Sequence, residues 1–328
     1  MRKEIFIETK KGDVYNITDT VYSISITQAL EGQAGKCTIT SSKLNMDIPL
    51  GSRLSVKIEN YGMFKGFLFS ESFSDSDTTS LVFYDQLRYW QLADNMSFKG
   101  KKLHEVFTHL CKTLNLNHKA FNTTRYVLPY KVWDNTSYFN IWKDCQDINL
   151  VNTNGFHIIR DEYGVLALRE IAYTFNKNTK KIILGDDSAS LGYSFTRSID
   201  EDTYNYVKII NENNETKKRE THIVQDKNTI AEWGRLQLTE KSSDELNAAQ
   251  LKQRAIDLLK LKNRITKKLS VTIEGNLDTY TLKAGDGVII GITSLVSAKL
   301  FGRALIISDI THRFNGSSYS IDLDLMLE

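Results

Sequence analysis

The sequence has 328 residues, 41% of them hydrophobic and 25% charged, which excludes an intrinsically disordered chain and is enough for about two domains with their own cores. Lysine and arginine (42) nearly balance aspartate and glutamate (40), and a net charge of +2 argues against a dedicated nucleic-acid binder. No apolar run approaches the ~20 residues that cross a bilayer, so we expect no membrane insertion.

The first segment, residues 1–97, alternates apolar and polar residues as strands do. Met1–Glu8 has this pattern and lacks the apolar core of a signal peptide, so we expect folding in a cytoplasm. Leu54–Ile58 alternates, Asn60–Gly62 supplies a turn, and Phe64–Phe69 returns as the next strand. Short strands punctuated by glycines predict a β-barrel domain over residues 1–97.

The second segment, residues 98–176, changes to a helical pattern and is predicted to be an α/β middle module. Its first helix carries an apolar face from Leu103 to Leu114, and a second helix is predicted to begin at Ser137. A hairpin follows over residues 156–168, with its turn at Asp161–Gly164.

The third segment, residues 177–328, is predicted to be a second β-barrel domain interrupted by one long helix over residues 243–262. Ser242 and Glu245 have the spacing of a capping box at the start of that helix. The predicted closing strands cover residues 269–273, 287–292, 304–310 and 319–327. The overall fold class is therefore mainly β with an α+β insert, and with only two prolines in the chain we expect docked domains.

A weak internal repeat relates the first and third segments. Gly51 leads an alternating strand, and Gly66, the lone Phe73 and a further strand follow; the second copy is led by Gly285, with Gly302 and Phe314 in the same order. The two glycine pairs are separated by 234 and 236 residues. We interpret this as a duplication, so that one chain carries two similar barrels and a trimer presents six. Any two β-meanders share glycines and alternation, and that alternative stays open.

Metal and thiol chemistry finds no support in the motifs. His104 and His109 resemble a zinc-binding helix, but they are five residues apart, whereas one helix face needs a spacing of four. Cys37, Cys111 and Cys145 are odd in number and widely spaced, and we expect buried structural thiols. We therefore predict no metal site.

Catalytic and phosphate-binding motifs are also lacking. The glycines of Gly285–Gly291 lead into a strand instead of a helix N-terminus, and Asp186–Ser188 has no partner acids at calcium-loop spacing. Glu162 and Glu170 are isolated acids that nothing marks as a glycosidase pair. We predict no catalytic residue, no cofactor and no enzymatic activity, and the pattern singles out no interface residue.

Five segments together resemble the baseplate hub proteins of contractile phage tails, most closely those of Gram-positive prophages and phage-tail-like bacteriocins. In chain order they are Tyr84–Tyr89 (YDxLxY), the hairpin Phe156–Leu168, Tyr204–Lys208 (YNxVK), Trp233–Gln237 (WGRLQ) and Thr311–Phe314 (THxF).

The resemblance implies a homotrimeric ring with two tube-like barrels per subunit, which adapts the six-fold tail tube to the three-fold central spike. It implies tail tube, spike, wedge and tape-measure proteins as partners, and a place in the tail baseplate of a virion or bacteriocin particle assembled in the bacterial cytoplasm. Residues 98–176 are the candidates for contacts that occur three times per ring. The alternatives are a tail-associated peptidoglycan hydrolase, a tail-tip carbohydrate-binding protein, and the hub-like part of a type VI secretion spike.

Overall fold

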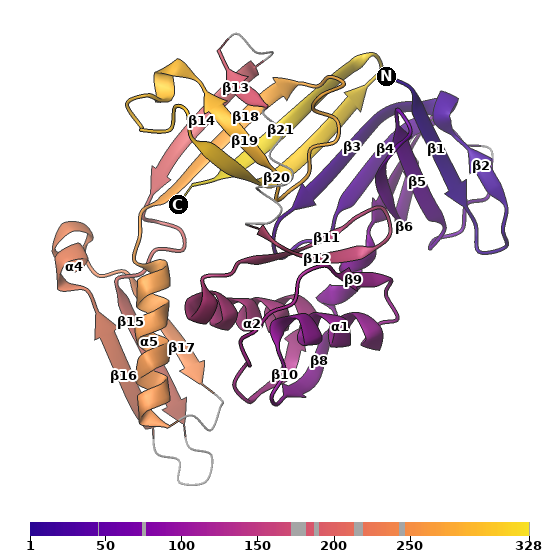
Figure 1. Ribbon diagram of the computed structural model, residues 1–328. Helices are drawn as coiled ribbons and strands as arrows, with labels where there is room; N and C mark the ends of the chain where they lie inside the picture. Colours follow the sequence, from indigo (N-terminus) through magenta and orange to yellow (C-terminus); the bar gives the residue numbers. More distant parts are fainter. Residues whose placement is uncertain are drawn as a thin grey trace. The chain divides into compact units, whose positions relative to one another are not determined.

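The computed structural model describes residues 1–44, 46–73, 77–171, 182–186, 190–212, 219–242 and 247–327. The protein is mainly β with few helices, as predicted (Figure 1). Contacts divide it into two units, one of residues 1–194 and 269–326, the other of residues 195–268 and 327–328. No helix in the described part of the chain has both the length and the apolarity to cross a membrane. The expected boundary between residues 176 and 177 lies outside the described residues.

Strands β1, β3, β4, β5 and β7 of the first segment alternate buried and less buried side chains, which confirms the period-two pattern. Leu54, Val56 and Ile58 are fully buried on one face of β5, for example. The elements are β1 (Lys3–Glu8), β2 (Val14–Asn16), η1 (Thr18–Thr20), β3 (Val21–Ala29), β4 (Lys36–Ser42), β5 (Arg53–Ile58), β6 (Tyr61–Phe73), β7 (Thr78–Tyr84) and η2 (Gln86–Gln91).

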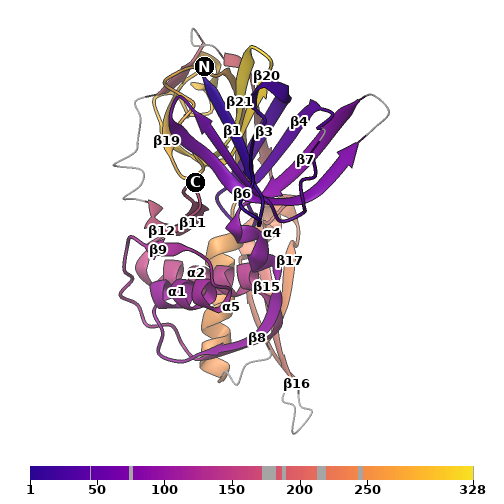
Figure 2. The same ribbon diagram turned by 90° about the vertical axis from the view of Figure 1, so that its right-hand side faces the viewer.

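The middle module packs two helices and small sheets around a core that contains Trp90, Phe107 and Trp142. Ser137 caps the second helix as predicted, its side chain accepting from the backbone N–H of Asn140 at 3.3 Å. Figure 2 shows α1 beside β9, as their contacts require. The elements are β8 (Ala93–Phe98), α1 (Leu103–Thr113), β9 (His118–Ala120), β10 (Lys131–Ser137), α2 (Tyr138–Thr153), β11 (His157–Asp161) and β12 (Leu166–Glu170).

The closing strands pair with the first segment in one 13-stranded sheet. Strand β20 pairs with β19 through Ala304–Ile306 and with β3 through Asp309–Asn315, so it belongs to both halves (Figure 1). Among the described strands, neither half closes on itself. The elements are β13 (Ile183–Gly185), β14 (Ser190–Ser198), β18 (Thr266–Glu274), β19 (Gly287–Gly291), η3 (Thr293–Leu295), β20 (Ala304–Asn315) and β21 (Ser318–Met326).

The strand order of the sheet repeats, which supports the duplication. One half reads β3-β4-β7-β6-β5-β1 and the other β14-β18-β21-β20-β19-β13. The pairing registers correct two of the predicted equivalences. When the two copies are aligned on their leading glycines, Gly66 is equivalent to Leu305 and not to Gly302. In the same alignment Phe73 is equivalent to His312 and not to Phe314.

The turn that leads each copy is the same in its backbone. Gly51 and Gly285 have φ of +85° and +90°, a region that favours glycine. Gly51 N donates to Leu68 O and Gly285 N to Ile307 O, both at 2.8 Å. The return bonds, from Leu68 N and Ile307 N to the residue after each glycine, are both 2.9 Å long. These bonds fix the glycine-led strand of each half against its neighbour.

The second unit is a three-stranded sheet covered by one helix. The sheet order is β16-β15-β17, and Val207, Ile209, Leu251 and Ala255 form the core beneath α5. The long helix begins later than predicted: Asn247 and Gln250 form its capping box, Ser242 ends β17, and Glu245 lies outside the described residues. The elements are β15 (Tyr206–Glu212), β16 (Arg219–Gln225), α4 (Lys227–Trp233), β17 (Gln237–Ser242) and α5 (Ala248–Lys262).

Candidate functional site: the joint around the middle hairpin

The β11–β12 hairpin carries the densest group of buried polar side chains in the first unit. Its two-residue turn, Tyr163–Gly164, has φ of +56° and +91°, as a type I′ turn requires, and Glu162 N donates to Val165 O at 2.8 Å. The hairpin contacts both halves of the large sheet, through Tyr163 in its turn and Arg160 on β11. We call this set of contacts the joint.

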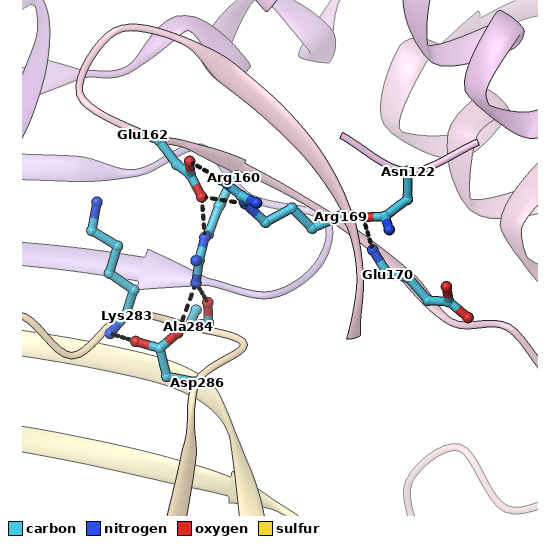
Figure 3. A network of polar contacts seen from close by, with 8 residues as sticks. All are labelled: Asn122, Arg160, Glu162, Arg169, Glu170, Lys283, Ala284 and Asp286. Carbon is cyan, nitrogen blue, oxygen red and sulfur yellow. Dashed lines mark hydrogen bonds and ion pairs between the residues drawn. The ribbon is translucent and has the colours of Figure 1, made fainter. Parts of the chain in front are cut away.

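On the side of the second half, Arg160 reaches the glycine-led turn of β19. Its Nη1 donates to Ala284 O at 2.9 Å and to Asp286 Oδ1 at 3.1 Å (Figure 3). The other Asp286 oxygen accepts from the backbone N–H of Lys283 at 3.0 Å. Arg160 is 8% and Asp286 6% exposed, so this ion pair is buried and depends on its complete set of hydrogen bonds.

Glu162 links this ion pair to a second arginine. Arg160 Nε donates to it at 3.0 Å, and Arg169 binds both of its oxygens at 2.8 Å (Figure 3). Burial alone would raise the pKa of Glu162. The hydrogen bonds and charges of Arg169 and Arg160 outweigh burial and lower the pKa to about 2. Burial alone would lower the pKa of Arg160. The charges and hydrogen bonds of Asp286 and Glu162 outweigh burial, so the pKa of Arg160 lies above its ordinary value. Glu162 and Arg160 are therefore both charged at neutral pH.

On the side of the first half, the joint is made by an aromatic ring. A Cβ on Gly62 would lie 2.5 to 2.8 Å from Tyr163 ring atoms, so only glycine leaves room for this ring. The Tyr163 hydroxyl hydrogen-bonds to the hydroxyl of Ser55, and Lys65 Nζ lies 5.7 Å from the ring centroid. The hairpin is therefore attached to the first half by packing, whereas an ion pair attaches it to the second half.

Two buried carboxyls stand between the halves. Asp85, in the YDxLxY segment, accepts from Gly35 N at 2.8 Å and Leu87 N at 2.9 Å, and Asp161 accepts from Gln86 Nε2 at 3.1 Å. Burial, and the nearby charge of Asp161, raise the pKa of Asp85 well above its ordinary value; burial also raises the pKa of Asp161. Each carboxyl fixes a turn through its accepted hydrogen bonds.

A cavity of about 350 Å³ opens beside this hairpin. We call it the basic pocket, because Arg53 and Lys65 are the only charged residues in the described part of its lining. Neither forms an ion pair with a carboxylate anywhere in the described ranges. Its lining is Arg53, Lys65, Gly66, Phe67, Gln86, Asn115, Asn117 and Gly164.

The residues examined as possible metal ligands or acids have structural partners. His104 Nδ1 lies 3.0 Å from Thr124 Oγ1, and the ring of His109 packs edge-on against Phe98. Asp186 accepts from the backbone N–H of Thr293 at 2.9 Å, and residues 187–188 lie outside the described residues. Glu170 donates its backbone N–H to Asn122 Oδ1 at 3.0 Å. Within the described ranges no group of three potential metal ligands comes together.

The three cysteines are free and buried, as predicted. Burial raises the pKa of each thiol, that of Cys145 to about 12, so they are protonated at neutral pH. They act as apolar core residues.

Three further segments of the resemblance make structural contacts in their own regions. Asn205 is fully buried and bonds both Gly234 O and Leu236 N at 2.8 Å, which joins the YNxVK and WGRLQ segments. His312, in THxF, lies between Tyr319 Oη at 2.8 Å and Leu282 O at 3.0 Å. Burial lowers the pKa of His312 to about 4.

The sequence pattern did not find Arg160 or Asp286. One signal was present: Arg160 directly follows two isoleucines in the predicted hairpin. The structure buries all five residues of β11, and a buried charge requires a partner. Asp286 follows a glycine, which suggested only a turn. Their separation of 126 positions left no local spacing to detect.

A family model described as YQBQ-like matches residues 24–326. The uncharacterized protein YqbQ of Bacillus subtilis (strain 168) is 24% identical over 279 residues, which is 84% of this chain and 81% of that protein. The phage-like element PBSX protein XkdQ of the same strain is 22% identical over 278 residues, with the same coverage.

Solved structures of phage tail proteins share the fold. The 43 kDa tail protein of prophage MuSo2 from Shewanella oneidensis has a TM-score of 0.67 at 15% identity, with 98% of both chains covered. A tail protein from Neisseria meningitidis MC58 has a TM-score of 0.69 at 13% identity, covering 100% of this chain and 97% of that one. The E. coli c3393 protein, a type VI secretion component, has a TM-score of 0.57 at 9% identity, covering 94% and 74%. The resemblance to phage tail proteins inferred from the sequence is confirmed.

Proposed function

This chain belongs to the YQBQ-like family, and we propose that it is the structural hub of a contractile tail baseplate, a homotrimeric ring that adapts the six-fold tail tube to the three-fold central spike. Residues 1–97 and 177–328 would be the two tube-like domains and residues 98–176 the middle module. The hub would act in a virion or bacteriocin particle, assembled in the bacterial cytoplasm with tube, spike, wedge and tape-measure proteins.

The observation that carries the proposal is the repeated strand order. Each chain has two half-sheets with the same order and the same glycine-led turn. Three such chains in a ring therefore offer six similar sheets, which suits a six-fold partner, while every other surface occurs three times. The middle module occurs once per chain and suits the three-fold spike.

The hydrolase alternative receives no support from Glu162, one of the two isolated acids that the sequence offered. A glycosidase needs one carboxyl that is protonated near neutral pH. Glu162 is bound by two arginines and has a pKa of about 2, so it cannot donate a proton there. Its contacts suit a structural role.

The hub-like part of a type VI secretion spike remains a second candidate, favoured by the fold shared with the E. coli c3393 protein. Both candidates predict a trimer. They differ in the partner that the trimer binds, a phage-type tail tube and spike or the components of a secretion system.

Light scattering on the chain co-expressed with the spike protein encoded beside it tests the proposal. A trimer gives a mass of about 112 kDa plus that of the spike, three times the 37.5 kDa of one chain. A 37.5 kDa monomer that binds no product of the neighbouring genes would refute the hub. Co-purification with secretion components alone would select the second candidate.

A further inference from the structure

We propose that the basic pocket binds a carboxylate presented by an acidic segment of a neighbouring protein. That the neighbour is a baseplate component rests on the proposed function, whereas the carboxylate site itself rests only on the geometry of the pocket. The pocket lies between β5, β6 and the turn of the β11–β12 hairpin, all within the first unit.

The two cations converge because of the strand register. Arg53 pairs with Phe67 and Ser55 with Lys65 across β5 and β6, so Arg53 and Lys65 are diagonal neighbours on the face opposite the buried Leu54. Diagonal neighbours are close enough for long side chains to meet, and two like charges there repel. Glu8, which pairs with Arg53 in the β1–β5 register, forms no ion pair with it. An anion bound in the pocket would relieve this repulsion.

The remaining lining is held in place by its own hydrogen bonds. Gln86 uses both ends of its amide, donating to Gly164 O at 2.9 Å and accepting from Asn117 N at 2.9 Å. Asn117 Nδ2 also donates to Gly164 O, at 3.1 Å. The walls are therefore pre-organised, and Phe67 adds an apolar surface for the methylene groups of an acidic side chain.

The size and charge of the pocket favour a protein carboxylate over a nucleic-acid backbone. A volume of about 350 Å³ lies in the range of sites that hold one small group. Binding to a phosphate backbone depends on neutralising several phosphates in a row. Two cations in a recess can neutralise one anion and cannot follow a strand.

Fluorescence anisotropy with the full chain and a fluorescein-labelled hexaglutamate peptide tests the site, with a labelled 20-nucleotide single strand as a second probe. The pocket variant is Arg53→Gln with Lys65→Gln. The matched control is Lys36→Gln with Lys57→Gln, which removes the same charge from the outer face of β4 and β5 without touching the pocket lining. Circular dichroism checks that both variants keep their secondary structure.

The proposal predicts that the pocket variant weakens hexaglutamate binding about tenfold or more and that the control changes it less than about twofold. Equal weakening in both variants indicates diffuse charge attraction and overturns the site, as does the absence of hexaglutamate binding to the wild-type chain. Tighter binding of the single strand than of hexaglutamate reassigns the pocket to nucleic acid and also overturns the proposal. A trimer by light scattering together with any of these results leaves the hub standing and rejects only the pocket.

Discussion

The two glycine-led turns of the large sheet have the same backbone and different side-chain roles. After Gly51 stands Ser52, whose hydroxyl donates to Pro49 O at 2.6 Å and so serves only its own turn. After Gly285 stands Asp286, which holds its turn and also receives Arg160 from the middle hairpin. The second turn therefore holds a third element as well as its own strand, while the two turns have the same backbone hydrogen bonds.

The first half holds the hairpin by packing and not by an ion pair. Tyr163, from the same hairpin, fits against Gly62 and has no charged partner in an ion pair. The hairpin is therefore attached by an ion pair on one side and by an aromatic ring on the other. The two attachments should respond differently to substitution and to pH.

The largest expected effect follows from breaking the ion pair. Arg160→Met leaves the buried carboxylate of Asp286 without its cation, and we expect a loss of about 3–5 kcal/mol in the free energy of unfolding. Ser52→Ala, at the matching position of the other turn, removes one hydrogen bond and should cost about 1 kcal/mol. Urea unfolding followed by tryptophan fluorescence measures both. If the two variants lost equal stability, the two turns would not differ as described.

Acid should destabilise the second half before the first. His312 has a pKa of about 4 in the folded chain against about 6.5 when unfolded, so the unfolded chain binds its proton more tightly. The free energy of unfolding should therefore fall by up to about 3 kcal/mol as pH drops from 6.5 to 4. The matching position in the first half is Phe73, which does not titrate.

The measurement is urea unfolding at several pH values between 7 and 4, for the wild type and for His312→Gln, which is neutral throughout. The variant should lose much of the slope in this interval. An unchanged slope would assign the acid sensitivity to other groups. Between about pH 4.5 and 2 a further loss is expected, because Glu162 binds a proton near pH 4.5 in the unfolded chain but only near pH 2 in the folded chain.

The smallest expected effect concerns the aromatic side of the joint. Gly62→Ala forces a methyl group against Tyr163, and we expect a cost of about 1–3 kcal/mol. Gly185→Ala is the matched control, because its nearest contact would be an ordinary 3.6 Å. Thermal unfolding compares the two, and adding Tyr163→Ala to Gly62→Ala should recover part of the loss. A Gly62→Ala chain as stable as the control would show that the ring does not fill this space.

Local patterns predicted the elements well because burial of a strand or helix face repeats at a fixed period. The helix face from Leu103 and the start of the second helix at Ser137 follow from such periods. The cap of α5 was misplaced because Ser242 has cap chemistry but ends β17, and Asn247 has the same chemistry five residues later.

Contacts distant in sequence could not be predicted in the same way. Gly302 seemed equivalent to Gly66 by spacing, but β5 and β6 are joined by the tight turn Glu59–Asn60, and β19 and β20 by a longer connection through η3. Equal spacing in the sequence therefore did not mean equivalent positions in the strand pairing. Arg160, Asp286 and the basic pocket depend on which strands meet, and no single segment of the sequence carries that information.

The pairing of β20 with β3 has a consequence for synthesis on the ribosome. Thr27 faces Thr311 in this register, with their hydroxyl oxygens 3.0 Å apart, so one edge of β3 gains its partner only after residues 309–315 have emerged. Until then the first half presents an open strand edge, the kind of surface through which nascent chains aggregate. A strand made 284 residues later, counted from Thr27 to Thr311, thus completes the pairing of β3, and we expect folding to be limited by this late, long-range pairing.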